Sequence, residues 1–403
     1  MLIAGLDVGT TKVCCFLARR EGGELRVVGI GHQVAKGLKA GTVVDMEAAE
    51  ASVRAAVDAA ERMAGDTVRD VFLTLTAGQP VSHTVRVEVA LAGHPVDDND
   101  LRRALDQGRA SDFGERQVIH AIPVGYTIDG TAGIRDPRGM FGDRLGVALH
   151  VVTAQPGPVR NLITCVERCH LKIAGLVAAP YASGLSTLVE DETDLGVTIV
   201  DLGGGTTTFA IFYDGSLVHT DSIPIGGGHI TTDIARGLST PLAHAERMKT
   251  LYGSVLSGKG DENEIIDVPQ VGESEHLNPN HVSRSILFGI VKPRAEEIFE
   301  MVRERLKASG FDKLAGRRVV LVGGGSQLQG VRELAARILD KQVRLGRPLR
   351  MAGLAEATGG PAFAACAGVL AYADNVQTEA PARLPKSSTA GFARLGQWLR
   401  LAF

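Results

Sequence analysis

Short apolar runs separated by glycine-containing turns dominate the start of the chain and predict β-strands. Leu2–Val8, Val13–Ala18 and Leu25–Ile30 follow one another closely, and Val71–Thr76 forms a further strand. Between them, apolar residues recur at helical spacing over Ala48–Met63, which predicts an amphipathic helix. The opening segment is therefore predicted to be an α/β unit.

Residues 83–158 have a different pattern, which predicts a separate module of short strands around one polar helix. After this module the helical pattern resumes in Pro156–His170. The strands are predicted at Thr84–Leu91, Val118–Tyr126 and Leu145–Thr153, with the helix at Asp97–Arg109.

The second half opens with a strand-turn-strand at Gly196–Phe212 that resembles the first segment of the chain. Residues 229–252 are predicted to be helical, and the polar, acidic residues 253–283 to be loops around a short strand. A long amphipathic helix with a bend at Pro293 is expected over Arg284–Ser309. The remaining elements are a strand at Val319–Val322 and helices at Val331–Leu339 and Pro361–Ala373.

Two glycine turns share one pattern, an aspartate at the end of an apolar strand followed by glycine and two threonines. They occupy Leu6–Lys12 and Val200–Thr207. Glycine lets backbone N–H groups approach phosphate oxygens, and threonine hydroxyls add further donors. The aspartates, Asp7 and Asp201, can hold hydrated Mg²⁺ beside those phosphates. One such turn is weak evidence, because an ordinary hairpin explains it, but a copy in each half predicts two similar lobes that close on a ligand.

A third glycine cluster, Val322–Ser326, follows a buried strand and precedes a helix. This context is typical of a nucleotide-binding turn. The string of a P-loop enzyme occurs nowhere in the chain.

The amino-acid composition narrows the classes of protein to which the chain can belong. With 403 residues, 44% hydrophobic and 22% charged, the chain is predicted to be globular with about two to four domains. Its 43 Lys and Arg against 46 Asp and Glu give a formal charge of −3, which disfavours a nucleic-acid partner. Five scattered cysteines favour reduced thiols in a cytoplasmic protein. Neither a signal peptide nor a membrane-spanning run of about 18 apolar residues is predicted.

The last residues form a separate unit of sequence. Residues 375–390 predict a flexible linker, and residues 391–403 an amphipathic helix too short to cross a bilayer. This helix could lie in a membrane interface, fold back onto its own domain or bind a partner protein, and the polar linker favours the membrane. The residues expected to contact a membrane are Phe392, Arg394, Leu395, Trp398, Leu399, Arg400 and Phe403.

The ordered set of glycine motifs resembles the superfamily of actin, seventy-kilodalton heat-shock proteins and sugar kinases. Ala179–Gly184 and Pro361–Gly368 resemble its two connecting helices, and Glu246 with Lys249 resembles a nucleoside-contacting pair. Within the superfamily, the strings in residues 83–158 resemble the relocated subdomain 1C of the FtsA family of bacterial cell-division proteins. These include His120–Pro123, Asp136–Met140 and His150–Thr153. The resemblance covers essentially the whole chain, although residues 254–283 match only loosely.

The resemblance implies an α/β, actin-like two-lobe ATPase fold of duplicated ribonuclease H-like domains. It divides the chain into lobe 1A (1–82 and 159–192), an SHS2-like subdomain 1C (83–158), lobe 2A (193–228 and 289–374) and subdomain 2B (229–288), before the linker and the membrane-targeting helix. The implied partners are FtsZ through 2B, further copies of the chain in filaments, other division-ring proteins through 1C, and anionic lipids on the inner face of the cell membrane.

The implied cofactors are ATP and Mg²⁺, with the metal at Asp7 and Asp201. The sequence leaves open whether ATP is hydrolysed, and no catalytic residue is assigned, since His150 and His229 are interpreted as structural. The alternatives are a small-molecule kinase, a chaperone ATPase, and a pilus-assembly or chromosome-organising actin homologue. The expected nucleotide-site residues are Asp7, Gly9, Thr10, Thr11, Lys12, Asp201, Gly203, Gly204, Gly205, Thr206, Glu246, Lys249, Gly323, Gly324, Gly325 and Ser326.

Overall fold

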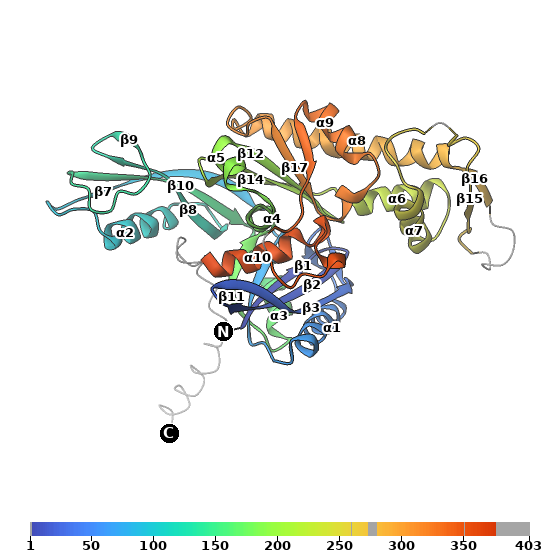
Figure 1. Ribbon diagram of the computed structural model, residues 1–403, viewed down its shortest axis with the longest axis horizontal. Coiled ribbons are helices and arrows are strands. Elements are labelled where there is room, and N and C mark those ends of the chain that lie inside the picture. Colours follow the sequence, from blue (N-terminus) through green and yellow to red (C-terminus); the bar gives the residue numbers. More distant parts are fainter. Residues whose placement is uncertain (1, 259, 273–279, 350, 376–403) are drawn as a thin grey trace, which may run out of the picture.

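The computed structural model describes residues 2–258, 260–272, 280–349 and 351–375. The predicted helix at 391–403, and the linker except for its first residue, lie outside the described residues. Within the described part, two lobes stand one above the other, and a third unit extends to the side that carries α2 (Asp98–Arg109) (Figure 1). No helix in the described ranges is long and apolar enough to cross a membrane.

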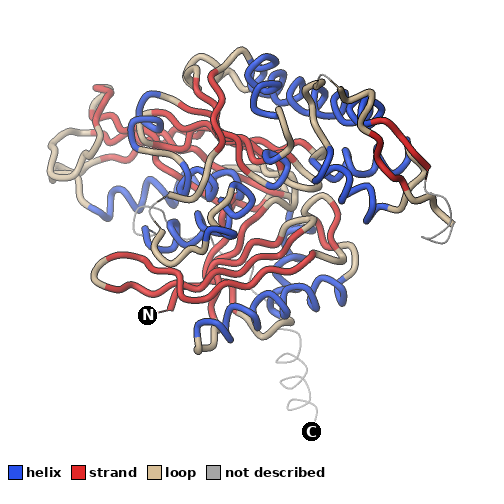
Figure 2. Tube along the Cα trace, turned by 45° about the vertical axis from the view of Figure 1, so that its right-hand side comes forward, coloured by secondary structure: helices blue, strands red, loops and turns tan. Residues whose placement is uncertain are grey.

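The two lobes repeat one sheet topology. In each, three antiparallel strands in sequence order are followed by two parallel strands that add beside the first strand (Figure 2). The internal duplication expected from the two glycine turns is therefore present as a duplicated fold. The first sheet contains β1 (Leu2–Val8), β2 (Lys12–Glu21), β3 (Glu24–Val34), β6 (Asp70–Leu75) and β11 (Lys172–Ala178). The second contains β12 (Val197–Leu202), β13 (Thr207–Tyr213), β14 (Ser216–Ile223), β17 (Arg318–Val322) and β18 (Gln342–Leu345).

Helices cover both sheets because each apolar strand face must be buried against another layer. In the first lobe, α1 (Met46–Ala64) and α3 (Pro156–Glu167) cover one face of the sheet, and Asp45 caps the start of α1 by accepting a hydrogen bond from the backbone N–H of Ala48. In the second lobe, α8 (Arg284–Ala308) and α9 (Val331–Leu339) cover one face of the sheet. The helix α8 continues through Pro293.

Two helices rich in small residues lie between the sheets, α4 (Ala179–Thr187) and α10 (Ala364–Asn375). Their backbones come so close that a Cβ atom on Gly368 would lie 1.7 Å from the carbonyl oxygen of Ala182. Glycine is therefore required at this crossing. The helices expected from Ala179–Gly184 and Pro361–Gly368 are present, although the second begins as a 3₁₀ turn, η3 (Pro361–Phe363).

The inserted unit has its own sheet, in the order β7-β10-β8-β9, and its own apolar core under α2. Asp97 caps α2 by accepting hydrogen bonds from the backbone N–H groups of Asn99 and Asp100. This unit matches the expected separate module of strands around one polar helix. Its strands are β7 (Val81–Ala90), β8 (Gln117–Ile128), β9 (Thr131–Ile134) and β10 (Arg144–Ala154).

Two sequence-based expectations in the second lobe need correction. The helix expected over 229–252 is two helices, α6 (Gly227–Gly237) and α7 (Leu242–Tyr252). Pro241 stands directly before the first turn of α7, a position that suits proline, whereas a proline inside a continuous helix would remove a backbone hydrogen bond. The single short strand expected in 253–283 is a pair, β15 (Ile265–Val268) and β16 (Asn280–Ser283). The short elements are β4 (Leu38–Lys39), β5 (Thr42–Val43), α5 (Glu190–Leu195), η1 (Gly324–Gln327) and η2 (Glu356–Thr358).

A buried hydrogen-bond group joins the inserted unit to the second lobe. The Ser82 hydroxyl donates to the carbonyl of Thr220 at 2.7 Å and accepts from the N–H of Thr220 at 2.7 Å. Because the hydroxyl has one proton, the imidazole of His150, 2.9 Å away, must donate to Ser82 from Nε2. Burial, with smaller effects from His219 and His120, lowers the pKa of His150 to about 3. His150 thus acts as a neutral structural residue.

This burial predicts a pH dependence of stability. The folded pKa of His150, about 3, lies below its unfolded value of about 6.5, so the stabilisation is complete above pH 6.5 and is lost as pH falls towards 3. We expect the unfolding free energy of the wild type to fall faster than that of His150→Gln between about pH 6 and 4, by up to about 1.4 kcal/mol per pH unit. Urea unfolding followed by circular dichroism measures both slopes. His281→Gln, at an exposed histidine, should keep the wild-type slope; equal slopes for wild type and His150→Gln would contradict the assignment.

Candidate functional site

A cavity of about 450 Å³ opens between the two lobes, at the turns that end β1 and β12. This volume lies within the range of small-molecule sites, about 300–1,000 Å³. Of the sixteen residues expected from the sequence, fourteen line it, so the fold brings together segments from both halves of the chain. They are Asp7, Gly9, Thr10, Thr11, Lys12, Asp201, Gly203, Gly204, Thr206, Glu246, Lys249, Gly323, Gly324 and Gly325.

The two glycine turns touch each other across the lobes. A Cβ atom on Gly204 would lie 2.3 Å from Cγ2 of Thr11, and one on Gly205 would lie 2.6 Å from Oγ1 of Thr10. Thr10 Oγ1 also accepts a hydrogen bond from the N–H of Gly41 at 2.9 Å. Glycines are needed here for close approach between lobes. Gly205 packs in this contact and does not line the cavity.

Asp7 and Asp201 are half-buried carboxylates at corresponding positions in the two lobes. Thr74 donates to Asp7 at 2.7 Å and Ser183 donates to Asp201 at 2.8 Å, which orients both groups. Burial raises the pKa of Asp7, against the opposing effects of Lys12 and the Thr74 hydrogen bond. Burial raises the pKa of Asp201 to about 6, with the Ser183 hydrogen bond opposing it and the negative charge of Asp7 adding to it.

Lys12 lies in the cavity wall, but its ammonium points to the segment before α10. The Nζ atom donates to the carbonyl of Ala362 and lies 3.5 Å from the centroid of the Phe363 ring. The sequence predicts Lys12 as a phosphate contact. In this structure it joins the first hairpin to the connecting helix, and a phosphate would compete for the same ammonium group.

The third glycine cluster forms the side of the cavity next to Asp201. Gly323 has a left-handed φ of 82°, and a Cβ atom there would lie 2.4 Å from the Asp201 carboxylate, so glycine is required. A Cβ atom on Gly324 would meet no protein atom within 4 Å. Ser326 is buried and donates to the carbonyl of Gly323 at 2.7 Å, so it supports the turn and does not line the cavity.

A further part of the cavity wall carries Glu246 and Lys249 on α7. The ammonium of Lys249 contacts Glu246 at 2.7 Å, the hydroxyl of Thr231 at 2.9 Å and the carbonyl of Gly227 at 3.1 Å. The Thr231 hydroxyl also donates to Glu246. This network ties α7 to the first turn of α6 and holds the carboxylate and the ammonium at the cavity.

Sequence reasoning missed part of this wall. The N–H groups of Gly227 and Gly228, at the start of α6, donate to the carbonyls of Gly203 and Gly204 at 2.9 and 2.7 Å, so they fix the second hairpin. The run Gly226–Gly228 before a helix was the available signal. The other missed lining residues are Thr76, Ala179, Thr208, Ile230, Thr250, Leu251, Gly253, Gln327, Leu328, Gln329, Ala362 and Ala365.

The arrangement fits a nucleoside phosphate with its metal. A bound cation would stabilise the two half-buried carboxylates, and their oxygens are ligands that suit Mg²⁺. In the described part of the chain no group of three or more His, Cys, Asp or Glu residues could hold a metal ion, so phosphate and water oxygens would have to complete its coordination. Glycine-lined walls leave room for phosphates to approach the backbone.

Two family models match the chain. "Cell division protein FtsA" matches residues 198–368, and "SHS2 domain inserted in FTSA" matches residues 77–153. The chain is 44% identical over 419 residues to the cell division protein FtsA of Rhizobium meliloti (strain 1021), across 100% of this chain and 95% of that protein. It is 32% identical over 416 residues to FtsA of Escherichia coli (strain K12), across 100% of this chain and 98% of that protein.

Solved structures show the same fold at low sequence identity. A PilM–PilN type IV pilus biogenesis complex matches with a TM-score of 0.64 at 17% identity, over 91% of this chain and 97% of that chain. MreB5 of Spiroplasma citri bound to ADP matches with a TM-score of 0.55 at 15% identity, over 93% and 97%. A second structure of that protein, bound to AMPPNP, matches equally well.

These findings decide among the alternatives that the sequence left open. The pilus protein and MreB5 share the fold alone, because their identities lie well below those of the cell-division relatives. The identities of 44% and 32% extend over the whole chain, including the inserted unit that one family model names. The chain therefore belongs to the FtsA family of cell division proteins, within the actin-like ATPase superfamily.

Proposed function

We propose that the chain binds ATP with Mg²⁺ between its lobes. The observation that carries this proposal is the cavity lined by both glycine turns and by both aspartates, Asp7 and Asp201. The turns of Gly9–Lys12 and Gly203–Thr206 would contact the phosphates, and Gly323–Gly325 would lie beside the adenine. Glu246 and Lys249 would contact the nucleoside, while Asp7 and Asp201 would hold Mg²⁺ and its water.

The bound metal would supply positive charge that screens the phosphates from the two carboxylates. The protein groups would orient the carboxylates and contact the phosphates. Thr74 and Ser183 keep the carboxylates oriented, and Lys12 can exchange its carbonyl partner for a phosphate oxygen. Because the ligand would contact both hairpins, its binding would favour one relative position of the lobes. This ordering role does not require hydrolysis.

We propose further that the chain is an adaptor which polymerises and tethers FtsZ filaments to the inner face of the cytoplasmic membrane at the division site. Family membership supports this role, together with the amphipathic sequence of 391–403. FtsZ would bind residues 229–288, and other division-ring proteins would bind the inserted unit. The membrane anchor would be the helix that contains Trp398, with anionic lipids attracting its arginines.

The energetics favour a reversible anchor. Each large apolar side chain buried contributes roughly 1.5–3 kcal/mol, and each arginine near anionic lipid about 1 kcal/mol. Ordering the backbone costs about 1–2 kcal/mol per residue, so one helix gives a small net gain. Filaments that present many such helices would bind much more tightly through effective concentration.

The nucleotide site can be tested with Gly324→Val. A Cβ atom at this position would meet no protein atom within 4 Å, so we expect the variant to fold. The valine side chain would occupy part of the cavity. We therefore expect the Kd for Mg·ATP to rise at least about tenfold, which corresponds to a loss of about 1.4 kcal/mol in binding free energy. Isothermal titration calorimetry measures the change. The matched control is Gly289→Val, at a helix position that also has open space and lies away from the cavity. Unchanged affinity in both variants would place nucleotide elsewhere.

The adaptor role can be tested by co-sedimentation of FtsZ with anionic liposomes. With the full chain and ATP, we expect FtsZ to pellet with the vesicles. A chain that lacks residues 391–403 should bind ATP with unchanged affinity and leave FtsZ in the supernatant, because only the anchor has been removed. If FtsZ stays in the supernatant with the full chain, or pellets equally with the truncated one, the tethering proposal is wrong.

A further inference from the structure

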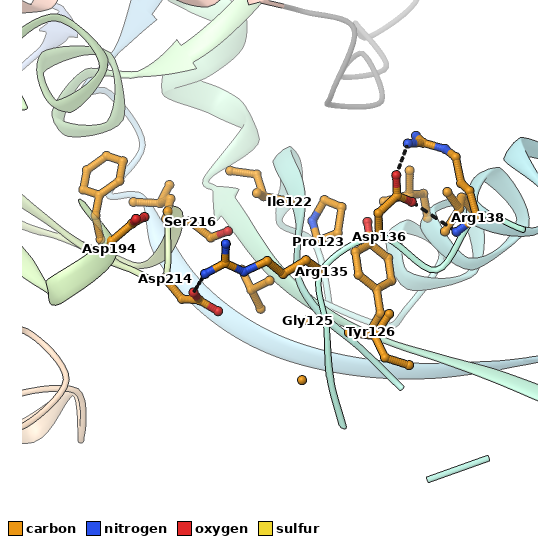
Figure 3. Close-up of a pocket in the computed structure, with 18 of the residues that line it drawn as sticks. Ile122, Pro123, Gly125, Tyr126, Arg135, Asp136, Arg138, Asp194, Asp214 and Ser216 are labelled. Carbon is orange, nitrogen blue, oxygen red and sulfur yellow. Dashed lines mark hydrogen bonds and ion pairs between the residues drawn. The ribbon is translucent and has the colours of Figure 1, made fainter. Parts of the chain in front are cut away.

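A second and larger cavity lies outside the nucleotide site. It is a groove of about 1630 Å³ between the inserted unit and the second lobe. Small-molecule sites reach about 1,000 Å³, so a groove of this size suits a peptide segment. Figure 3 shows β8 residues such as Ile122 and Pro123 on one side, and Asp194, Asp214 and Ser216 on the other.

The groove combines an apolar base with an acidic wall. Ile122 and Val124 of β8 pack with Tyr181 and Phe212 in one apolar cluster that lines the groove. The facing wall, formed by α5 and the turn between β13 and β14, carries the exposed carboxylates Glu190, Asp194 and Asp214. Six acidic and four basic residues line the groove altogether. They are Asp98, Asp106, Asp136, Glu190, Asp194 and Asp214, against Arg102, Arg109, Arg135 and Arg138.

A weak ion pair crosses the groove at this wall. Arg135 reaches Asp214 at 3.7 Å, and the two side chains are 85% and 63% exposed (Figure 3). Exposed ion pairs of this kind contribute about 0–1 kcal/mol. A cationic segment could therefore take the place of Arg135 beside Asp214 at little cost.

The end of α10 lies next to the groove. Tyr372, in its last turn, packs against the ring of Tyr181 with centroids 6.0 Å apart, and Tyr181 lines the groove. The helix ends at Asn375. The sixteen residues from there to the predicted helix at 391–403 would span about 20–24 Å as a flexible linker. The groove is therefore within easy reach of the segment that follows.

The sequence of that segment complements the groove. Residues 376–403 carry the cations Arg383, Lys386, Arg394 and Arg400 against one carboxylate, Glu379. Their predicted helix presents an apolar stripe that includes Leu395 and Trp398. An apolar stripe flanked by cations matches an apolar base flanked by carboxylates, in the manner of a helix bound in a groove.

We propose that this groove is the docking site for residues 391–403 of the same molecule, with residues 376–390 as the tether, when no membrane is present. A short tether gives an effective concentration on the order of millimolar, so an intrinsic Kd of about 0.1 mM would keep about nine-tenths of the chains docked. Docking would withdraw the helix from lipid. This last consequence rests on the proposed membrane anchor, whereas docking itself does not.

Trp398 makes the proposal measurable, because it is the single tryptophan of the chain. In the full chain without lipid, we expect its emission to be blue-shifted relative to a free peptide of residues 391–403. The double variant Glu190→Lys/Asp194→Lys reverses the acidic wall at exposed positions and should restore the emission of the free peptide, with about two- to threefold stronger quenching by acrylamide. The control Asp58→Lys/Glu300→Lys makes the same charge change on exposed helix positions away from the groove and should behave as wild type.

Each alternative gives a distinct result. A wild-type emission equal to that of the free peptide, or a blue shift that the groove variant retains, would overturn the proposal. A blue shift that disappears on dilution would show docking between molecules and would also overturn it. Addition of anionic liposomes tests the anchor separately, since the groove variant should bind them about tenfold more tightly than wild type if nine-tenths of wild-type tails are docked. If neither protein binds liposomes, the anchor proposal fails while the lipid-free result still decides on docking.

Discussion

The site depends on two carboxylates that lie half-buried where the lobes meet. Asp7 and Asp201 lie at the end of the first strand of each duplicated sheet, and the negative charge of Asp7 adds to the free energy of ionising Asp201. Hydroxyl donors from Thr74 and Ser183 offset part of this cost. Mg²⁺ held by these carboxylates, as proposed above, would offset more of it. The charge arrangement would then become more favourable with nucleotide and metal bound than without them.

The rest of the fold brings these carboxylates together and lets the lobes respond. The hairpins touch through Gly204 and Thr11, and the connecting helices cross where Gly368 meets Ala182. Packed cores move as units, so a ligand that contacted both hairpins would act on whole lobes. The inserted unit is joined to the second lobe through Ser82 and Thr220. A change in lobe position would therefore also reach the groove beside that joint.

Sequence predicted the parts of the site that short motifs determine. A strand end, glycine spacing and threonines identified both hairpins, and their repetition predicted the duplicated lobes. Contacts between distant segments gave no local signal. Nothing near Lys12 indicates that its ammonium would reach Ala362. The run Gly226–Gly228 marks a turn before a helix, but it does not indicate that the turn would donate its N–H groups to the second hairpin. Gly205 and Ser326 have the expected spacing but pack behind the cavity wall, because turn geometry decides which members of a motif face the ligand. The large groove has no motif at all, since it arises from the placement of one unit beside another.

The most direct test of a shared nucleotide site is amide hydrogen exchange of the full chain with and without Mg·ATP. We expect added protection at the hairpins of both lobes, in peptides that contain Gly9–Lys12 and Gly203–Thr206, together with α4 and α10. Protection of one hairpin alone, or of neither while ATP is bound, would contradict the claim that the ligand joins the two lobes.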